Sequence, residues 1–420
     1  MKCVAVKPFS TCGWFTAPPS KSESHRLLIL AALSQTPSVI NGLSRCADVA
    51  ATIRCLRALG ASIIFEGDSC RVTPSSLKRV PYAELVCGES GSTLRFLLPA
   101  CLLLAEKAVF SGSGRLPTRP ISGLIKALED NGARFSGHAL PFCAGGRLKN
   151  GDYIVPGGVS SQYISGLVMS LPLLNGPSRI LLNSGLVSAG YVDITLDAMR
   201  RFGVQVQRAQ GQLVVPGPQR YLPVAGYRVE GDWSGASYLF AAAAISGSVA
   251  CAGLPQVSLQ PDRRIIELVR AFGAKAHWQA GRAVVAQAQL HGADIDVSGA
   301  PDLFPALAVI GAAARGKTVL YNAEGLRLKE SDRLSAMEDT LNRLGANARA
   351  YPDRLEIYGC GRIKGGHVDG RGDHRIVMAA AAAAAASESE IIINGADAIE
   401  KSYPKFFDDY RRIGGKAYVL

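Results

Sequence analysis

The sequence predicts an α/β fold of six repeated units, and two signatures that recur along its 420 residues carry this prediction. The first is a glycine at the end of each amphipathic helix, typical of a left-handed C-terminal cap, at Gly60, Gly132, Gly203, Gly273, Gly345 and Gly414. The second is an almost wholly apolar helix with a polar start, expected over 20–33, 90–105, 160–174, 234–245, 302–314 and 373–386. A helix that is apolar on all sides is buried on all sides.

Each unit reads as buried helix, strand, amphipathic helix, strand, strand. A period of about 70 residues is long for a stacked solenoid and favours compact subdomains. The sixth unit ends after one strand, 416–420, and the unpaired strand 2–8 at the start of the chain can supply its partner. Six units divide most simply as three and three, so we expect one domain over 15–228 and a second over 1–14 with 229–420.

The composition indicates a globular protein, because 48% of the residues are apolar and 19% are charged. The net charge of +12 is compatible with nucleic acid, an acidic membrane surface or anionic small substrates. Aromatic residues make up only 7%, which is poor for stacking on nucleic acid bases. The ten cysteines include no C-x-x-C pair, and the longest apolar run, 376–386, is too short to span a bilayer. With no apolar segment of signal-peptide length at the start, we expect a cytoplasmic protein with reduced thiols.

The most highly charged stretch, 325–334, comes directly before an amphipathic helix. It contains three cations, two carboxylates and a hydroxyl: Arg327, Lys329, Glu330, Ser331, Asp332 and Arg333. Acids alone would suit the positive end of a helix. Cations at that place indicate that the helix start binds an anion. The alternative is a surface turn with solvated ion pairs.

The starts of the buried helices repeat this pattern. Serines with Lys21 and Arg26 open the first helix, glycines and serines with Arg95 open the second, and Ser160-Ser161-Gln162 opens the third. Further acids and cations occur at Asp302, Asp373-His374-Arg375, Arg115, Arg119 and Lys401. Taken singly, the acids and serines can be helix caps, His374 a buried histidine and Lys401 a solvated charge. Taken together, they favour a shared site for substrates with more than one phosphate or carboxylate.

Seven motifs in this order resemble those of the 5-enolpyruvylshikimate-3-phosphate (EPSP) synthase family, over about residues 14–412. They are Pro19-Ser20-Lys21-Ser22-x-Ser24-x-Arg26, Gly91-Ser92-Thr93-x-Arg95, Arg119-Pro120, Ser160-Ser161-Gln162, Leu328-Lys329-Glu330-Ser331-Asp332-Arg333-Leu334, Asp373-His374-Arg375 and Lys401-x-Tyr403-Pro404. The resemblance implies two domains, each of three pseudo-symmetric βαβαββ units around buried helices, an inside-out α/β barrel.

The resemblance also implies a function. Members of this family transfer the enolpyruvyl group of phosphoenolpyruvate to the 5-hydroxyl of shikimate 3-phosphate, through a tetrahedral intermediate. The reaction belongs to the shikimate pathway, which leads to chorismate and the aromatic amino acids, and the phosphonate glyphosate inhibits it. We therefore expect a cytoplasmic, monomeric transferase with small-molecule substrates, no metal or other cofactor, and no nucleic acid or membrane partner.

The family's functional residues carry over to matching positions here. The resemblance places shikimate 3-phosphate against Lys21, Ser22, Arg26, Ser160, Ser161, Gln162, Ser188, Tyr191, Asp302 and Lys329. It places phosphoenolpyruvate against Lys21, Gly91, Arg119, Gln162, Arg333, Arg375 and Lys401. Asp302 and Glu330 are expected to transfer protons, with Lys21 assisting.

Three positions depart from the pattern: Glu89 and Gly325 stand where members have Asn, and Ala189-Gly190 replaces a Lys-Pro pair. The related transferase that acts on UDP-N-acetylglucosamine is the nearest alternative. It uses a cysteine before the Arg-Pro pair, but loop 111–119 contains none, and Ser22 follows Lys21 where that relative has Asn. A basic nucleic-acid-binding protein of related fold is the alternative from another class.

Overall fold

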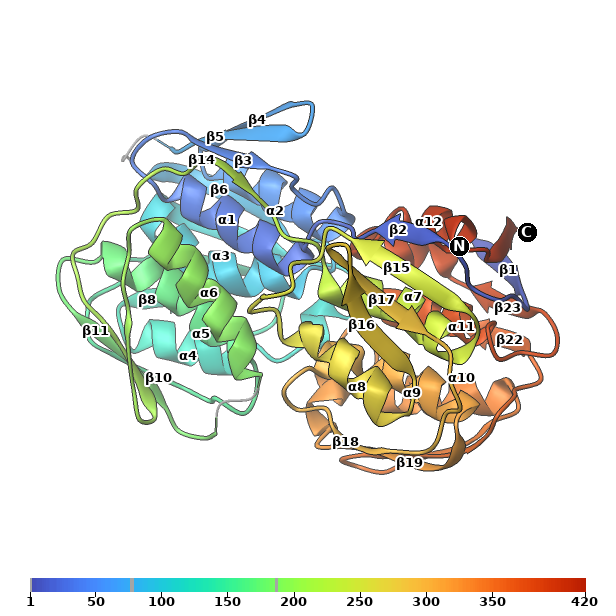
Figure 1. Ribbon diagram of the computed structural model, residues 1–420. Coiled ribbons are helices and arrows are strands. Elements are labelled where there is room, and N and C mark those ends of the chain that lie inside the picture. The colour runs from blue at the N-terminus through green and yellow to red at the C-terminus, as the bar shows by residue number, and fades with distance from the viewer. Residues whose placement is uncertain (1, 76–78, 186–187) are drawn as a thin grey trace. The chain divides into compact units, whose positions relative to one another are not determined.

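The computed structural model describes residues 2–75, 79–185 and 188–420, and the chain divides into two compact units (Figure 1). The N-terminal unit is Pro19–Glu230, and the C-terminal unit combines Met1–Pro18 with Gly231–Leu420. Strand β2 (Trp14–Thr16) pairs in parallel with β15 (Ser248–Ala252). This pairing places the chain up to Pro18 in the C-terminal unit, whereas the sequence-based limit was residue 14.

The N-terminal unit contains three repeats, each built of one buried helix, one amphipathic helix and four strands. The first consists of β14 (Ala225–Arg228), α1 (Lys21–Ala32), β3 (Ser38–Asn41), α2 (Ala47–Ala58), β4 (Ser62–Glu66) and β5 (Ser69–Thr73). The second consists of β6 (Val80–Val86), α3 (Gly91–Leu104), β7 (Ala105–Ser111), α4 (Ser122–Glu129), β8 (Ala133–Phe135) and β9 (Phe142–Gly146). The third consists of β10 (Asp152–Val155), α5 (Ser161–Ser170), β11 (Ser178–Leu182), α6 (Ala189–Arg201), β12 (Gln207–Ala209) and β13 (Gln212–Val215).

The C-terminal unit repeats this plan three more times. Its first repeat consists of β2, α7 (Trp233–Ile245), β15, α8 (Ile265–Ala271), β16 (Lys275–Gln279) and β17 (Arg282–Ala286). The second consists of β18 (Asp294–Asp296), α9 (Phe304–Ala313), β19 (Arg315–Tyr321), α10 (Arg333–Arg343), β20 (Asn347–Ala350) and β21 (Leu355–Cys360). The third consists of β22 (Gly366–Asp369), α11 (His374–Ala383), β23 (Ile391–Asn394), α12 (Phe406–Arg412), β24 (Lys416–Val419) and β1 (Cys3–Lys7).

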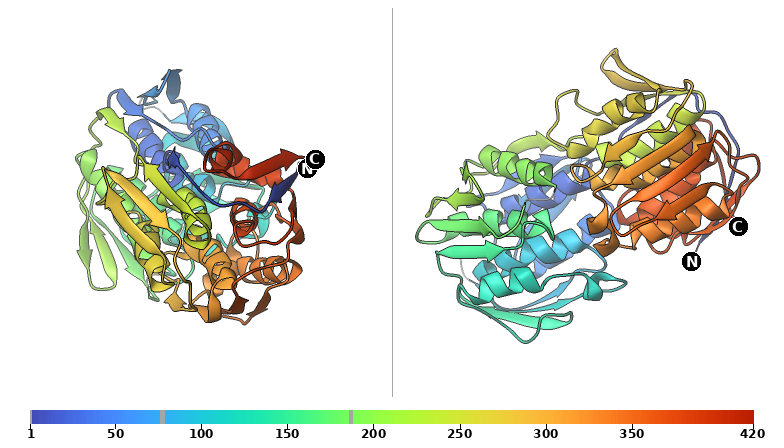
Figure 2. Two further views of the ribbon diagram at one scale, coloured as in Figure 1. Left: turned by 45° about the vertical axis from the view of Figure 1, so that its right-hand side comes forward. Right: turned by 90° about the horizontal axis from the view of Figure 1, so that it is seen from below.

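Each repeat forms a four-stranded sheet, and the described residues contain six of them. In four of these sheets the strands before and after the buried helix run parallel, and the last two strands add in antiparallel fashion, as in the order β6-β7-β9-β8. In the other two, the strands before α1 and α7 are exchanged: β14 pairs in parallel with β3, and β2 with β15. Strand β1 lies between β23 and β24, with Val4 opposite both Ile393 and Val419. The expected partner of the last strand is therefore confirmed, and both views in Figure 2 place the two termini near each other.

The cores form around the buried helices, which all lie inside the sheets of their own unit (Figure 1). Every residue of α9 is buried, as its wholly apolar sequence predicts. Helices α3 and α5 approach closely at Gly166, where a Cβ would lie 2.3 Å from the Arg95 carbonyl oxygen. The glycines predicted to end the amphipathic helices all have positive φ: Gly60, Gly132, Gly203, Gly273, Gly345 and Gly414. In the part of the chain described, no helix has both the length and the apolar character needed to cross a membrane.

Candidate functional site

In the N-terminal unit, side chains at the starts of α1, α3 and α5 form a polar group that we call the serine cluster. Its members are Lys21, Ser22, Ser92, Ser160, Ser161 and Gln162. Ser20, Ser90 and Ser160 cap the three helices by accepting hydrogen bonds from backbone N–H groups. The starts of α3 and α5 are joined directly, because Gln162 Nε2 donates to Ser92 Oγ over 3.0 Å. Three positive helix ends and their hydroxyls are thus suited to anion binding.

Lys21 is positioned by a carboxylate that the sequence analysis did not single out. Its Nζ lies 2.9 Å from Asp48 Oδ2, and both side chains are largely buried. The backbone carbonyl of Asp48 also accepts a hydrogen bond from Thr93 Oγ1, which ties α2 to the start of α3. Asp48 lies 27 residues after Lys21 in the first turn of another helix, so no local motif in the sequence connects the two.

Arg26 is 2% exposed, and most of its donors are used inside the unit. The guanidinium donates to Thr195 Oγ1, Ser165 Oγ and the backbone carbonyls of Ser22 and Tyr191. Since a guanidinium has five N–H donors, at most one is left for a ligand. Burial lowers the pKa of Arg26 to about 10, which still leaves it protonated at neutral pH. Arg26 therefore supports the packing of α5 and α6.

Gly91 is the first residue of α3, and two arginines crowd its α-carbon. A Cβ there would lie 2.6 Å from Arg95 Nη1 and 2.8 Å from Arg119 Nη1. Arg95 in turn donates to Gln162 Oε1 over 2.9 Å, which fixes the Gln162 amide. Glu89 turns toward the loop before Arg119, because a Cβ on Gly114 would lie 2.1 Å from Glu89 Oε2. Arg95 is a further supporting residue that the sequence motif contained but the predicted site omitted.

Ser188 and Tyr191 lie at the start of α6. Ser188 has a left-handed backbone with φ of 55°, and its side chain does not cap the helix. The Tyr191 carbonyl accepts hydrogen bonds from Arg26 and from Thr195 Oγ1. Both residues therefore belong to the same end of the N-terminal unit as Arg26.

In the C-terminal unit, charged side chains gather at the starts of α9, α10 and α11, and we call them the arginine cluster. Its members are Asp302, Glu330, Arg333, Asp373 and Arg375. Arg333 is 1% exposed and touches three carboxylates at once. Its Nε lies 2.9 Å from Asp373, its Nη1 3.0 Å from Asp302 and its Nη2 2.7 Å from Glu330. The charged stretch before α10 is therefore a buried ion-pair network, and the interpretation as a solvated surface turn is wrong for these residues.

Asp302 bridges the two arginines of this cluster, since Arg375 Nη2 lies 2.7 Å from Asp302 Oδ2. Asp302 lies in a short 3-10 helix, Pro301–Leu303, and α9 has Leu303 at its cap position with no side-chain cap. The capping interpretation of Asp302 is therefore wrong. Asp373 does cap α11, by accepting from the Arg375 N–H, and it also binds Arg333 and Ser331 Oγ.

The ion pairs control the ionisation of both aspartates. Burial by itself would raise the pKa of Asp302, but Arg375, Lys329 and Arg333 outweigh it and hold that pKa well below its usual range. Burial also opposes ionisation of Asp373, and Arg333 is the main group that lowers its pKa. Both carboxylates are therefore ionised at neutral pH, and each binds a proton weakly while its ion pairs are in place.

The remaining predicted residues lie near the same helix starts. Lys401 Nζ donates a hydrogen bond to the Gly372 carbonyl, just before α11. His374 is 1% exposed, as the interpretation of a buried histidine expects, and its Nδ1 lies 3.8 Å from Asp373 Oδ1. A Cβ on Gly325 would meet no atom within 4 Å, so this position is open. Among the residues described, no three histidine, cysteine or acidic side chains gather as metal ligands.

Comparison with known proteins gives one consistent result. The sequence model of the family described as EPSP synthase (3-phosphoshikimate 1-carboxyvinyltransferase) matches residues 10–410. The 3-phosphoshikimate 1-carboxyvinyltransferase of Clostridium acetobutylicum is 38% identical over 425 residues, covering 100% of this chain and 99% of that protein. The protein of the same name from Methanothrix thermoacetophila is 40% identical over 418 residues, covering 98% of each. The solved structure of EPSP synthase from Acinetobacter baumannii superposes with a TM-score of 0.82 at 25% identity, covering both chains completely.

Proposed function

The chain belongs to the EPSP synthase family, and we propose from this premise that it is an enolpyruvyl transferase of the shikimate pathway. It transfers the enolpyruvyl group of phosphoenolpyruvate to the 5-hydroxyl of shikimate 3-phosphate and releases phosphate. The observation that best supports this function is the arginine cluster, in which two buried guanidinium groups hold an ionised Asp302 beside Glu330. Such a cluster offers cations for an anionic substrate and carboxylates for proton transfer.

Each unit is assigned mainly to one substrate. Lys21, Ser22, Ser160, Ser161 and Gln162 of the serine cluster are assigned to shikimate 3-phosphate, with Arg26, Ser188 and Tyr191 at the same end of the unit. Asp302 and Lys329 are assigned to this substrate as well. Arg333 and Arg375 of the arginine cluster bind phosphoenolpyruvate, together with Lys21, Gly91, Arg119, Gln162 and Lys401. This assignment is supported by the capped helix starts of the serine cluster and by the crowding of two guanidinium groups around Gly91.

The reaction requires two opposite proton movements. In the addition, the 5-hydroxyl loses its proton and its oxygen bonds to C2 of phosphoenolpyruvate, while C3 gains a proton to give the tetrahedral intermediate. In the elimination, C3 loses a proton, the double bond re-forms and the C2–O bond to phosphate breaks. Asp302 and Glu330 carry these protons, and Lys21 assists the hydroxyl or the departing phosphate.

The ion pairs explain how Asp302 becomes an effective base. With Arg333 and Arg375 bound to it, the carboxylate holds a proton weakly. A bound phosphoenolpyruvate competes for the same two guanidinium groups through its carboxylate and phosphate. Each hydrogen bond transferred to the substrate removes stabilisation from the Asp302 anion and raises its basicity. Substrate binding thus prepares the base that the first step needs.

A phosphate-release assay with each substrate omitted in turn tests the function. Phosphate should appear only when phosphoenolpyruvate and shikimate 3-phosphate are both present, and UDP-N-acetylglucosamine should not replace the second. Release with UDP-N-acetylglucosamine alone as acceptor would assign the chain to the alternative transferase.

We also propose that the protein is a cytoplasmic monomer that binds no nucleic acid. The low aromatic content supports the last point, despite the net charge of +12. Light scattering after size exclusion checks the monomer. A filter-binding titration with DNA across a salt series tests for nucleic-acid binding, since binding to a phosphate backbone weakens steeply as salt rises.

A further inference from the structure

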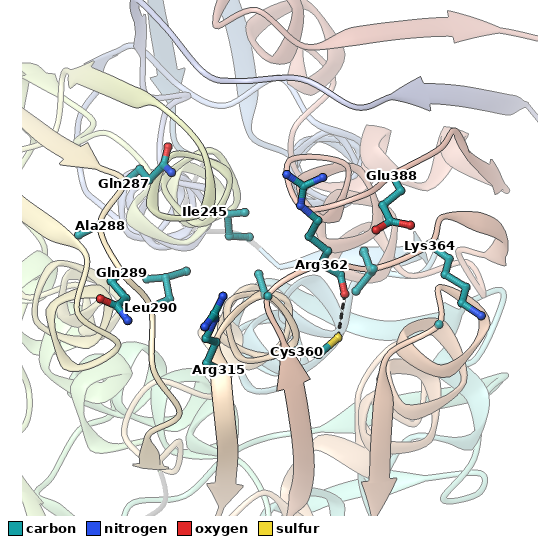
Figure 3. Close-up of a pocket in the computed structure, with 14 residues that line it drawn as sticks. Ile245, Gln287, Ala288, Gln289, Leu290, Arg315, Cys360, Arg362, Lys364 and Glu388 are labelled. Carbon is teal, nitrogen blue, oxygen red and sulfur yellow. Dashed lines mark hydrogen bonds between the residues drawn. The ribbon is translucent and has the colours of Figure 1, made fainter.

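The C-terminal unit contains a cavity of about 610 Å³ where helices α7 and α9 end (Figure 3). Its apolar floor includes Ile245, Leu290, Ala313 and Ile363. Helix α9 runs ten residues from the arginine cluster to this cavity, a rise of roughly 15 Å. The cavity is therefore separate from the proposed active-site residues, and its size suits a small molecule.

Two guanidinium groups line this cavity. Arg315 begins β19 and Arg362 follows β21, and both side chains lie at the cavity in Figure 3. Gly361, which has a positive φ of 93°, lies beside Arg315 in this lining. The other charged side chains that line the cavity are Lys364 and Glu388, which gives three cations against one carboxylate. The cavity therefore has a positive charge.

Gln287 and Gln289 also line the cavity, and in Figure 3 they lie across it from Arg362. The two residues follow β17, which ends at Ala286. The Gln287 Oε1 accepts a hydrogen bond of 2.9 Å from the Gly247 N–H. This contact turns its amide NH₂ group toward other partners. Guanidinium and amide donors thus border the same space over an apolar floor.

Cations near helix C-termini can have a purely structural role, because the helix dipole is negative there. Arg79 in the N-terminal unit has that role, since its Nε donates to the Ala105 carbonyl just after α3 and its Nη2 to the Gly146 carbonyl. Arg315 and Arg362 differ. Within 2–75, 79–185 and 188–420, neither guanidinium forms an ion pair or donates a hydrogen bond. Their donors are available to a ligand.

We propose that this cavity binds a small polyanion, a molecule with at least two phosphate or carboxylate charges. Arg315 and Arg362 would bind it through charge-assisted hydrogen bonds, which are strongest when a guanidinium meets a phosphate or carboxylate edge to edge. Gln287 adds an uncharged donor. The site is independent of the proposed enzymatic function, because none of its residues belongs to either cluster.

Cys360 provides a reporter inside the cavity. It is exposed, lines the cavity and has its Sγ 3.0 Å from the Arg362 carbonyl oxygen. Cys12 is exposed in the same unit but does not line the cavity, so it serves as an internal control. N-ethylmaleimide is uncharged, and its reaction with each thiol can be followed by peptide mass spectrometry. Labelling is measured with pyrophosphate, with citrate and with chloride at matched ionic strength.

Pyrophosphate, citrate or both should slow labelling of Cys360, by roughly tenfold when the anion is at ten times its Kd. Labelling of Cys12 should not change. Protection by only one of the two anions identifies phosphate or carboxylate as the preferred group. Protection should disappear in the Arg315→Gln/Arg362→Gln variant and decrease in each single variant. It should persist in the control Arg343→Gln, which removes an exposed cation paired with Asp339.

Three results would overturn the proposal: unchanged Cys360 labelling with both anions, equal slowing of Cys12, or protection that survives in the folded double variant. Circular dichroism and the melting temperature verify that each variant is folded. If the double variant does not fold, the two single variants provide the same test.

Discussion

The serine cluster lies at the starts of three buried helices, whereas the arginine cluster lies at the starts of the buried helices α9 and α11 and of the amphipathic helix α10, and the two clusters handle charge differently. The serine cluster relies on hydroxyl caps, an amide and the Lys21–Asp48 pair. The arginine cluster places Arg333 among three carboxylates, with Arg375 on one of them. The serine cluster can bind an anion by adding contacts, whereas the arginine cluster must give up existing ion pairs to bind one. Strong coupling between ligand and proton affinity is therefore expected only in the arginine cluster.

The comparison predicts the largest effect for the two carboxylates assigned to proton transfer. Asp302→Asn and Glu330→Gln keep the side-chain volume but remove the basic group, so turnover should fall by roughly 10²–10⁴-fold. Binding of shikimate 3-phosphate should persist, since the serine cluster is intact. Steady-state rates and calorimetric binding measure the two quantities.

Asp48→Asn is the matched change in the serine cluster, since it also neutralises a carboxylate that contacts a cation. It should lower turnover less than either variant above. If the Asp302 and Glu330 variants keep turnover within a few-fold of the parent, the proton transfers belong to other groups, with Lys21 next.

The second prediction concerns stability. Arg333→Met leaves three carboxylates without their shared partner, and Asp373 is completely buried, so unfolding should become easier by about 3–5 kcal/mol. Arg343→Met, which breaks an exposed pair with Asp339, should cost about 0–1 kcal/mol. Urea denaturation monitored by circular dichroism gives both values. Equal losses in the two variants would mean that the buried network contributes no more than a surface pair.

The third prediction concerns glyphosate. A methyl group in Gly91→Ala would displace the Arg95 and Arg119 guanidinium groups. Loss of one hydrogen bond to a charged group is worth about 1.5–3 kcal/mol, so inhibition should weaken by roughly tenfold or more. We predict that glyphosate competes with phosphoenolpyruvate, whose KM should rise as well. Inhibition constants of parent and variant provide the measurement, and Gly325→Ala, at an open position, is the control. Equal inhibition of parent and Gly91→Ala would contradict the prediction.

The smallest effect is a difference in acid sensitivity. The Asp373 pKa is depressed, so its contribution to stability is present above the unfolded pKa near 3.8 and is lost as pH falls. The Glu23 pKa in the N-terminal unit is raised, mainly by burial. The ionised Glu23 side chain therefore destabilises the folded state, and its protonation as pH falls removes this destabilisation. Below about pH 5, Asp373→Asn should therefore make the loss of unfolding free energy with acid shallower, and Glu23→Gln should make it steeper. Urea titrations between pH 7 and 3 test this. If both variants changed the slope of unfolding free energy against pH in the same direction, the opposite pKa shifts of Asp373 and Glu23 would be contradicted.

The repeats could be predicted without a structure, because each signature is local. A glycine after an amphipathic helix needs only its own backbone conformation, and a wholly apolar helix must be buried wherever it lies. The family motifs likewise supplied Lys21, Asp302, Arg333 and Arg375 as candidates. The pairing of strand 2–8 with the last strand also followed from counting strands in the repeats.

The contacts of each candidate residue, in contrast, became visible only in the folded chain. Asp48 reaches Lys21 from another helix, and Asp302 meets Arg333 over 31 residues of intervening chain. The structure also shows that Asp302, a possible cap in the sequence, is an ion-pair partner with a lowered pKa. It shows as well that Arg26 has almost all its hydrogen-bond donors in use. The reason is physical: a cap depends on one turn of backbone, whereas ionisation and free donors depend on every charge and hydrogen-bonding group that the fold brings within a few ångströms.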